Sequence, residues 1–386
     1  MLSTVDCGYI RGPMKNKTIK SLYFLLIVFI LCELTCRAFI HFSGYKIEKF
    51  RPLAYYFKGP NMVYFNLAYL PNPFLPFTLR PTDSREFLQR NKFNNSIDVF
   101  KYRTNAFGFR GKDITMEKPE NCLRVICLGG STTFSTTNDD DTWPVQLERM
   151  LREHFPDKRV EVLNLGMNSA SSPFSFILLA LKGVHFKPDL VIDYEGFNDI
   201  WQGMGFKGGI NTDYTTYLKD MSFPNKLQNA AGYYKKKLTP KFLYTSYFFS
   251  ISDYLFDRFI LNRSEDMSAH YINMMDKAPE RPLKDMEIFI SNLRSIAGVA
   301  RSHNAKVLFS TIHTFDDDKI VAQVNTGIIN LAGEINVEVV DQNALIPHND
   351  KSIHSDNIHF TPYGNKIVAE NFYRAILKYK LLQGES

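Results

Sequence analysis

The sequence lacks both the cysteine content of a disulfide-rich protein and the charge excess of a nucleic-acid-binding protein. Only five cysteines occur in 386 residues, and Cys122 and Cys127 lie too close together on one extended stretch to bridge easily. The cysteines therefore neither require nor exclude an oxidising compartment. The net charge of +6 is small for this length, and the basic residues are scattered without a recognised nucleic-acid motif. We expect no nucleic-acid partner.

Phosphate-binding motifs are also missing. Gly129 and Gly130 follow an apolar run, as glycines do in phosphate-binding loops, but neither the Gly-Lys-Ser/Thr ending nor the GxGxxG spacing is present. The absence of both motifs disfavours a nucleotide-binding site. The glycine pair therefore needs another explanation.

One long apolar segment is present, and it lies near the N-terminus. Residues 21–42 follow a short basic tail and make up roughly the 20 residues that a bilayer-spanning helix needs. Glu33 and Arg37 lie four residues apart, so on a helix they share a face and can pair. No small-x-small cleavage site follows, which favours an uncleaved anchor. A removed signal peptide and a buried soluble helix are the alternatives.

The residues on either side of this segment suggest how the chain is placed. The flanking positive charges are nearly balanced, so the short N-terminal tail decides and favours the cytoplasm for residues 1–20. The anchor over residues 21–42 is then followed by an extracytoplasmic lead-in over residues 43–120, which is predicted to form short strands and loops. The rest of the chain is expected in the periplasm or outside the cell. The sequence leaves the oligomeric state open.

Residues 121–386 carry an alternating pattern of short apolar runs and helical segments. This pattern predicts an α/β domain with a five-stranded parallel sheet covered by helices on both faces. The five runs are "LRVICLGG", "VEVLNLG", "PDLVIDYEG", "AKVLFSTIH" and "VEVVD". In such sheets ligands bind beyond the carboxyl ends of the strands, so chemistry is expected where each run stops.

A predominantly helical insertion is predicted over about residues 203–282, where the alternation is interrupted. It contains the aromatic stretch "YTSYFFSISDYLFDRFIL". We interpret these aromatic residues as a packed cap. A membrane-contacting face and a sugar-binding platform are the alternatives.

Candidate reactive groups follow three of the runs. Ser131 comes directly after Gly129 and Gly130, and a tight glycine turn there can project its hydroxyl at the sheet edge. Gly166 ends the second run with a backbone N–H, and Asn198 ends the third with a carboxamide. Taken singly, each is more often a structural turn or a helix cap than a functional residue.

A fourth group precedes the last helix. Asp356 lies three residues before His359, a spacing that lets a carboxylate accept the imidazole N–H in a tight turn and raise the basicity of the ring. His354 lies nearby and is interpreted as a surface residue. Together the four positions supply a nucleophile, two oxyanion donors besides the serine N–H, and an oriented base.

This ordered set resembles the SGNH (GDSL-type) hydrolase superfamily over roughly residues 122–381. The resemblance implies a three-layer, flavodoxin-like α/β/α fold without metal or other cofactor. It also implies acyl-ester hydrolysis or transfer, with Ser131 as nucleophile, His359 as base and Asp356 as its orienting acid. Gly166 and Asn198 would complete the oxyanion hole.

One departure from the family pattern stands out. The first block normally reads Gly-Asp-Ser, whereas this chain has Gly130 in place of the aspartate. The "LGGSTT" variant, with "TNAFGFRG" upstream and an N-terminal anchor, resembles membrane-anchored bacterial members linked to surface polysaccharide. The leading hypothesis is therefore an esterase that removes acetyl or similar groups from a carbohydrate or related envelope substrate. An O-acyltransferase using the same residues and a catalytically degenerate glycan-binding protein are the alternatives.

Overall fold

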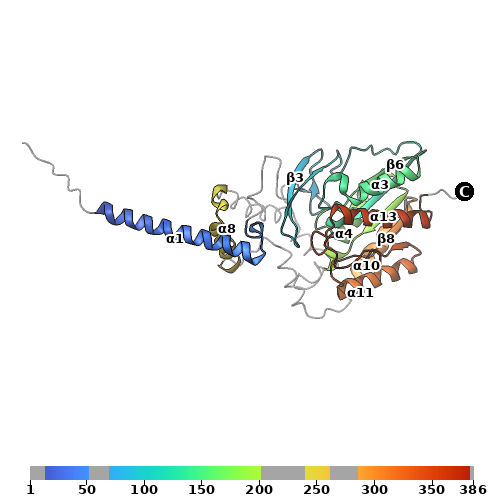
Figure 1. Cartoon of the computed structure of the whole chain (residues 1–386). Coiled ribbons are helices and arrows are strands. Elements are labelled where there is room, and N and C mark those ends of the chain that lie inside the picture. Colours follow the sequence, from blue (N-terminus) through green and yellow to red (C-terminus); the bar gives the residue numbers. More distant parts are fainter. Residues whose placement is uncertain (1–13, 52–68, 201–239, 261–285, 383–386) are drawn as a thin grey trace, which may run out of the picture. The chain divides into compact units, whose positions relative to one another are not determined.

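The computed structural model describes residues 14–51, 69–200, 240–260 and 286–382 (Figure 1). These residues fall into two compact units. The N-terminal unit contains residues 14–51 and 240–260, and the main unit contains residues 69–200 and 286–382.

The main unit is built on a five-stranded sheet with the order β6-β5-β7-β8-β9, in which all neighbours are parallel. This confirms the predicted sheet. Its strands are β5 (Cys122–Gly129), β6 (Arg159–Asn164), β7 (Leu190–Tyr194), β8 (Lys306–Ser310) and β9 (Glu338–Val340).

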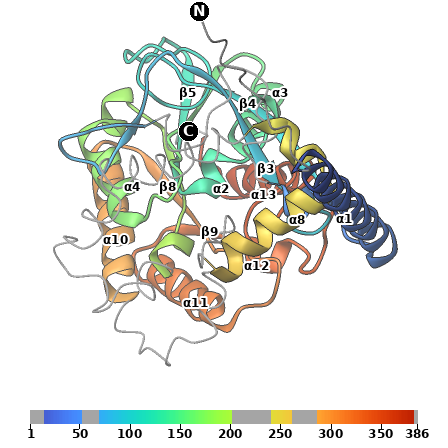
Figure 2. The ribbon, with the colours of Figure 1, turned by 90° about the vertical axis from the view of Figure 1, so that its left-hand side faces the viewer.

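Helices cover both faces of the sheet, as predicted for a three-layer α/β/α fold (Figure 2). Along β5, Val125 and Cys127 belong to the core beneath one face, and Ile126 and Leu128 belong to the core beneath the other, because side chains alternate along a strand. The first face packs against α3 (Trp143–His154) and α13 (Pro362–Lys378). The second packs against α4 (Ser172–Leu181), α10 (Glu287–Ser302) and α11 (Lys319–Glu334). Shorter helical elements are α2 (Ser131–Phe134), η4 (Asp139–Asp141), η5 (Gly183–Phe186) and α12 (Gln342–Leu345).

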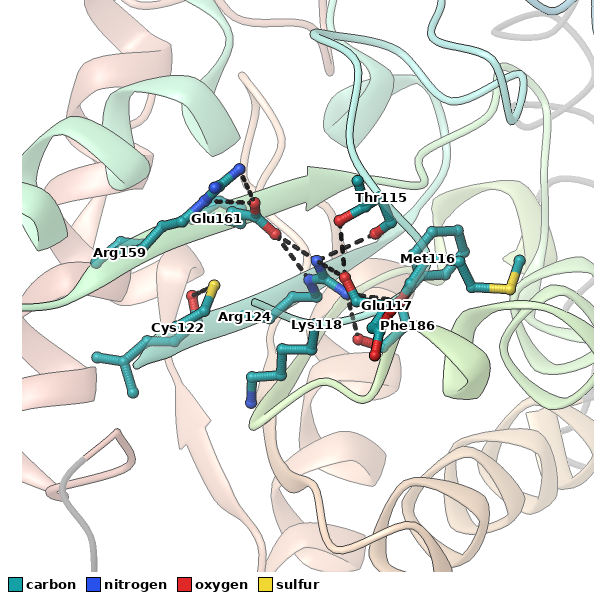
Figure 3. Close-up of polar contacts among 12 residues, drawn as sticks. Thr115, Met116, Glu117, Lys118, Cys122, Arg124, Arg159, Glu161 and Phe186 are labelled. Carbon is teal, nitrogen blue, oxygen red and sulfur yellow. Dashed lines mark hydrogen bonds and ion pairs between the residues drawn. The ribbon is translucent and has the colours of Figure 1, made fainter. Parts of the chain in front are cut away.

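A buried ion pair fixes the register of the two strands that begin the sheet (Figure 3). Arg124 on β5 lies opposite Glu161 on β6, and its Nε and Nη2 donate to Glu161 Oε2 over 2.8 and 2.6 Å. The remaining Arg124 donors reach backbone carbonyls, including that of Phe186 at 2.7 Å. Both side chains are almost completely buried, so loss of either partner would leave an uncompensated charge in the core.

Of the lead-in expected over residues 43–120, residues 69–120 form short strands and loops and belong to the main unit, whereas residues 43–51 belong to the N-terminal unit. They contain two antiparallel pairs. The strands are β1 (Tyr69–Leu70), β2 (Thr78–Leu79), β3 (Ser84–Arg90) and β4 (Ile97–Arg103).

The N-terminal unit is helical. Its first element is α1 (Met14–Ser43), in which residues Ile19–Ser43 have a mean hydropathy of 2.1 and are long and apolar enough to cross a membrane. The other elements are η1 (Ile47–Phe50), η6 (Lys241–Thr245), α8 (Tyr247–Leu255) and η7 (Phe256–Ile260). The aromatic stretch of the predicted insertion therefore packs within this unit, for example with the Phe248 ring edge-on to Phe29 at 5.9 Å. Most of the predicted insertion lies outside the described residues.

Candidate active site

Ser131 is presented at the carboxyl edge of the sheet by a tight turn after β5. Gly129 has a φ of +147°, and a Cβ atom there would collide with the backbone carbonyl of Tyr194 on the neighbouring strand. Only glycine satisfies both conditions. Ser131 then begins α2, so the chain reverses directly after the strand and leaves the hydroxyl at its end.

A continuous hydrogen-bond chain joins Ser131 to two residues of the loop before α13. His359 Nε2 lies 2.8 Å from Ser131 Oγ, and His359 Nδ1 lies 2.6 Å from Asp356 Oδ2. The structure thus brings Ser131 to His359, 228 positions further along the sequence, and to the neighbouring Asp356. The side chains of His359 and Asp356 are 18% and 22% exposed, so solvent and substrate can reach the chain of groups.

The Asp356 carboxylate is held in its ionised form. Burial alone would raise its pKa, but His359 and the N–H groups of Ile358 and His359, which donate to Oδ1 at 2.9 and 2.8 Å, outweigh it and lower the pKa to about 2. An ionised acceptor at Nδ1 places the ring proton there, which leaves Nε2 as the acceptor facing the Ser131 hydroxyl.

Asn198 lies directly beside Gly130. Its Nδ2 donates to the carbonyl of Ala170, and a Cβ atom on Gly130 would lie 2.5 Å from that Nδ2. In this geometry a side chain at position 130 would displace the Asn198 amide, and Gly130 leaves room for it. The structure brings Asn198 next to the Ser131 turn, as the sequence suggests.

Gly166 is placed differently from its predicted role. Its N–H donates to Asn164 Oδ1 at 2.9 Å, and its Cα packs against the backbone of Thr133 and Phe134. Because its single N–H is already engaged, Gly166 is not available as an oxyanion donor in this geometry. Ser169 has a φ of +60° in the turn that follows Gly166. This turn brings the carbonyl of Ala170 close to Gly130.

A group of buried carboxyls lies under the end of β7 and was missed in the sequence. Asp199 accepts hydrogen bonds from the N–H and the hydroxyl of Ser172, which tie the Asn198 segment to the start of α4. Burial raises the pKa of Asp199 to about 7, although these hydrogen bonds oppose the shift. Burial and the charge of Asp199 likewise raise the pKa of Asp193 to about 7, and Glu195 is shifted upward for the same reasons.

Arg110, in the "TNAFGFRG" stretch, is a second residue whose position was not predicted. Its guanidinium is buried, and Nη1 donates to the carbonyls of Phe134 and Ser135 at 2.7 and 2.6 Å. Its Nε pairs with Asp139 at 2.9 Å. One side chain therefore fixes the segment that leaves α2, directly after the candidate nucleophile.

A small cavity of about 20 Å³ opens beside Ser131. Its lining includes Phe197, Ile312 and His313. The interpretation of His354 as a surface residue is wrong, because this side chain is fully buried and its ring stacks on His313 at 5.1 Å. Its Nδ1 lies 3.0 Å from the carbonyl of Asp350, and the backbone pairs with Phe360, which draws the ring inward.

Among the residues that the structure describes, no group of three or more His, Cys, Asp or Glu side chains that could hold a metal ion is found. The arrangement of Ser131, His359 and Asp356 can deprotonate a serine hydroxyl through an oriented imidazole, next to the amide of Asn198.

The fold places the protein among the SGNH serine hydrolases. Residues 127–367 match the model of the GDSL-like lipase/acylhydrolase family, and the chain belongs to that family.

Several solved structures are similar at low identity. The acetyl xylan esterase AlAXEase is 15% identical with a TM-score of 0.40, and the match covers 66% of this chain and 100% of that one. Axe2, an acetylxylan esterase from Geobacillus stearothermophilus, is 14% identical with a TM-score of 0.40 and coverage of 66% and 94%. A GDSL-like lipase from Bacteroides thetaiotaomicron is 13% identical with a TM-score of 0.37 and coverage of 69% and 93%. No curated protein matches the sequence significantly.

Proposed function

We propose that the protein is a serine esterase that removes short acyl groups, acetyl above all, from a carbohydrate or related cell-envelope substrate. The observation that carries the proposal is the hydrogen-bond chain from Asp356 through His359 to Ser131. The cavity beside Ser131, among the residues that the structure describes, has room for a small acyl group such as acetyl. The carbohydrate part rests on the resemblance of "LGGSTT" and "TNAFGFRG" to polysaccharide-linked relatives.

In the proposed mechanism Ser131 Oγ attacks the ester carbonyl carbon while its proton moves to His359 Nε2. Asp356 stabilises the imidazolium that forms. The Ser131 N–H and Asn198 Nδ2 donate to the oxyanion, each worth on the order of 3 kcal/mol in the transition state. The imidazolium then protonates the leaving alcohol, and water attacks the acyl-serine with His359 again as base.

We also propose that α1 anchors the protein in a membrane and leaves the main unit outside the cytoplasm. The support is the apolar length of Ile19–Ser43 and the short basic tail before it.

A chain-length series tests the proposed specificity. The full-length protein in detergent is assayed with aryl esters from acetate to long-chain acyl, and with an acetylated oligosaccharide. We expect kcat/KM to be highest for acetate and to fall steeply with chain length, and we expect free acetate from the oligosaccharide. Faster hydrolysis of long-chain esters would contradict the short-acyl assignment, and transfer of acetyl to an added glycan in place of water would favour the acyltransferase.

A further inference from the structure

The residues of η6, α8 and η7, here called the 240–260 segment, expose large apolar side chains. Phe242, Phe259 and Ile260 are 68–72% exposed, and Leu255 and Phe256 are 42% and 51% exposed. Five exposed apolar side chains in such a short segment are unusual on a surface that faces water.

The segment is tied to α1 through Glu33. Glu33 Oε2 accepts from the Ser246 hydroxyl at 2.8 Å and from Phe248 N–H at 3.0 Å, and Oε1 accepts from Tyr247 N–H at 3.2 Å. These donors belong to the start of α8, where N–H groups lack partners within the helix. Arg37 pairs with the same carboxylate at 2.7 Å and lies 4.4 Å from the centre of the Tyr247 ring.

This attachment sets the depth of α8 if α1 spans a bilayer. Glu33 lies ten residues before the end of α1 at Ser43, which is about 15 Å along a helix axis. The hydrocarbon core is about 30 Å thick, so the start of α8 lies at the level of the membrane and not in bulk water. A membrane-embedded carboxylate needs partners within the protein, and α8 and Arg37 supply them.

We infer that the 240–260 segment is a second membrane-contacting element, whose partner is the phospholipid bilayer that α1 crosses. The inference rests on the proposed anchoring role of α1. Two polar side chains bond within the segment: Tyr244 donates to Asp253 at 2.9 Å, and Ser250 donates to the Ser246 carbonyl at 2.8 Å. A helix that contacts a membrane presents aromatic and aliphatic side chains such as these to the lipid.

Basic residues of the same unit suit the headgroups of such a bilayer. They are Lys46 and Lys49, which follow the end of α1. Positive charges at this level attract anionic lipids, so the expected partner is a bilayer that contains anionic phospholipid.

Tryptophan scanning of the full-length protein tests the inference. Phe256→Trp and Phe259→Trp are made singly, and each protein is reconstituted in phosphatidylcholine–phosphatidylglycerol vesicles whose acyl chains are brominated near the headgroup or near the middle of the bilayer. The emission of the two native tryptophans is subtracted. Phe24→Trp in α1, at a site 66% exposed, reports spanning, and Ile329→Trp, at a site 41% exposed in the main unit, is the matched control.

We expect the emission of both segment variants to shift to shorter wavelength and to be quenched by the brominated chains, because the start of α8 is bound to Glu33 within the span of α1. Phe24→Trp should be quenched by the deep bromines, and Ile329→Trp by neither. Quenching of Phe24→Trp without any quenching at 256 and 259 would overturn the inference and leave the anchor intact. Loss of quenching at all three sites would overturn the anchor itself. Ester hydrolysis is measured separately on a soluble substrate. Its outcome tests the proposed esterase activity and does not depend on either quenching result.

Discussion

At the scale of single residues, the proposed role of Asp356 is to hold the His359 ring in the orientation and tautomer that Ser131 needs as nucleophile. Because its pKa is lowered to about 2, the carboxylate stays charged throughout the pH range in which esters are assayed. An amide at this position could instead donate to Nδ1 and leave the ring proton on Nε2, so the nitrogen that faces the serine could no longer accept its proton.

We therefore expect Asp356→Asn to lower kcat by about 10⁴-fold with little change in KM. The measurement is steady-state hydrolysis of an acetyl ester by the full-length protein. Asp350→Asn is the matched control, because Asp350 accepts its side-chain hydrogen bonds from nearby Ser352. A small loss in Asp356→Asn, similar to that of the control, would remove Asp356 from the site.

Gly130 gives a second prediction at this scale. A methyl group at position 130 would lie 2.5 Å from Asn198 Nδ2, so Gly130→Ala should displace the amide from the oxyanion and lower kcat by about 10²-fold or more. Gly298→Ala, in α10 with open space around its Cα, is the control and should keep full activity. Full activity of Gly130→Ala would show that Asn198 does not donate in the transition state. Gly130→Asp, which restores the usual motif letters, should be impaired as well.

At the scale of elements, residues 69–120 position the site although they contain none of its reactive groups. Arg110 holds the segment after α2, and Lys92 donates through its backbone N–H to the Ser355 carbonyl at 2.8 Å. Lys92 Nζ also reaches Asn357 Oδ1 at 3.0 Å. The lead-in therefore supports both the segment after the candidate nucleophile and the loop that carries Asp356 and His359.

Arg110→Gln should destabilise the main unit by about 3 kcal/mol, because it leaves buried carbonyls without donors and removes the buried half of the pair with Asp139. The control is Arg103→Gln, since Arg103 approaches the same Asp139 only at 3.9 Å with a side chain 65% exposed. Its loss should be below about 1 kcal/mol. Chemical denaturation of the full-length variants measures both, and equal losses would contradict the positioning role.

The sequence predicts some parts of the structure better than others, because only contacts that leave a local pattern can be recognised in it. The strands and helices of the sheet leave a local periodicity, and the candidate nucleophile and base stand where strands or helices begin and end. The hydrogen bonds of Arg110 to the α2 segment and the packing of His354 on His313 depend on contacts between distant parts of the chain. Neither produces a local pattern, so both were missed. Gly166 was chosen because it ends an apolar run, but Asn164 two residues earlier takes its N–H.

At the scale of the whole molecule, stability should depend on pH through the buried carboxyls under β7. Asp193 has a pKa of about 7 in the folded protein, against about 3.9 in an unfolded chain. Between these values the folded state holds a proton that the unfolded state has lost. The contribution of Asp193 to the free energy of unfolding therefore falls by up to about 1.4 kcal/mol per pH unit as pH rises from 4 to 7.

Asp193→Asn removes this loss, because the amide does not titrate. We expect the stability of the variant relative to the natural protein to increase steadily from pH 4 to pH 7 and to level off above it. Urea denaturation at a series of pH values measures the difference. A difference that stays constant over this range would show that Asp193 is ionised in the folded state.

The central claim, that Ser131 is activated by His359 and Asp356 to form an acyl-enzyme, is tested most directly by covalent labelling. The full-length protein is treated with a fluorophosphonate, and the modified peptide is identified by mass spectrometry alongside an acetyl-ester assay. We predict labelling at Ser131, loss of labelling in Ser131→Ala, and a fall in kcat of that variant by about 10⁶-fold. Labelling at another residue, or ester hydrolysis that persists in Ser131→Ala, would contradict the account.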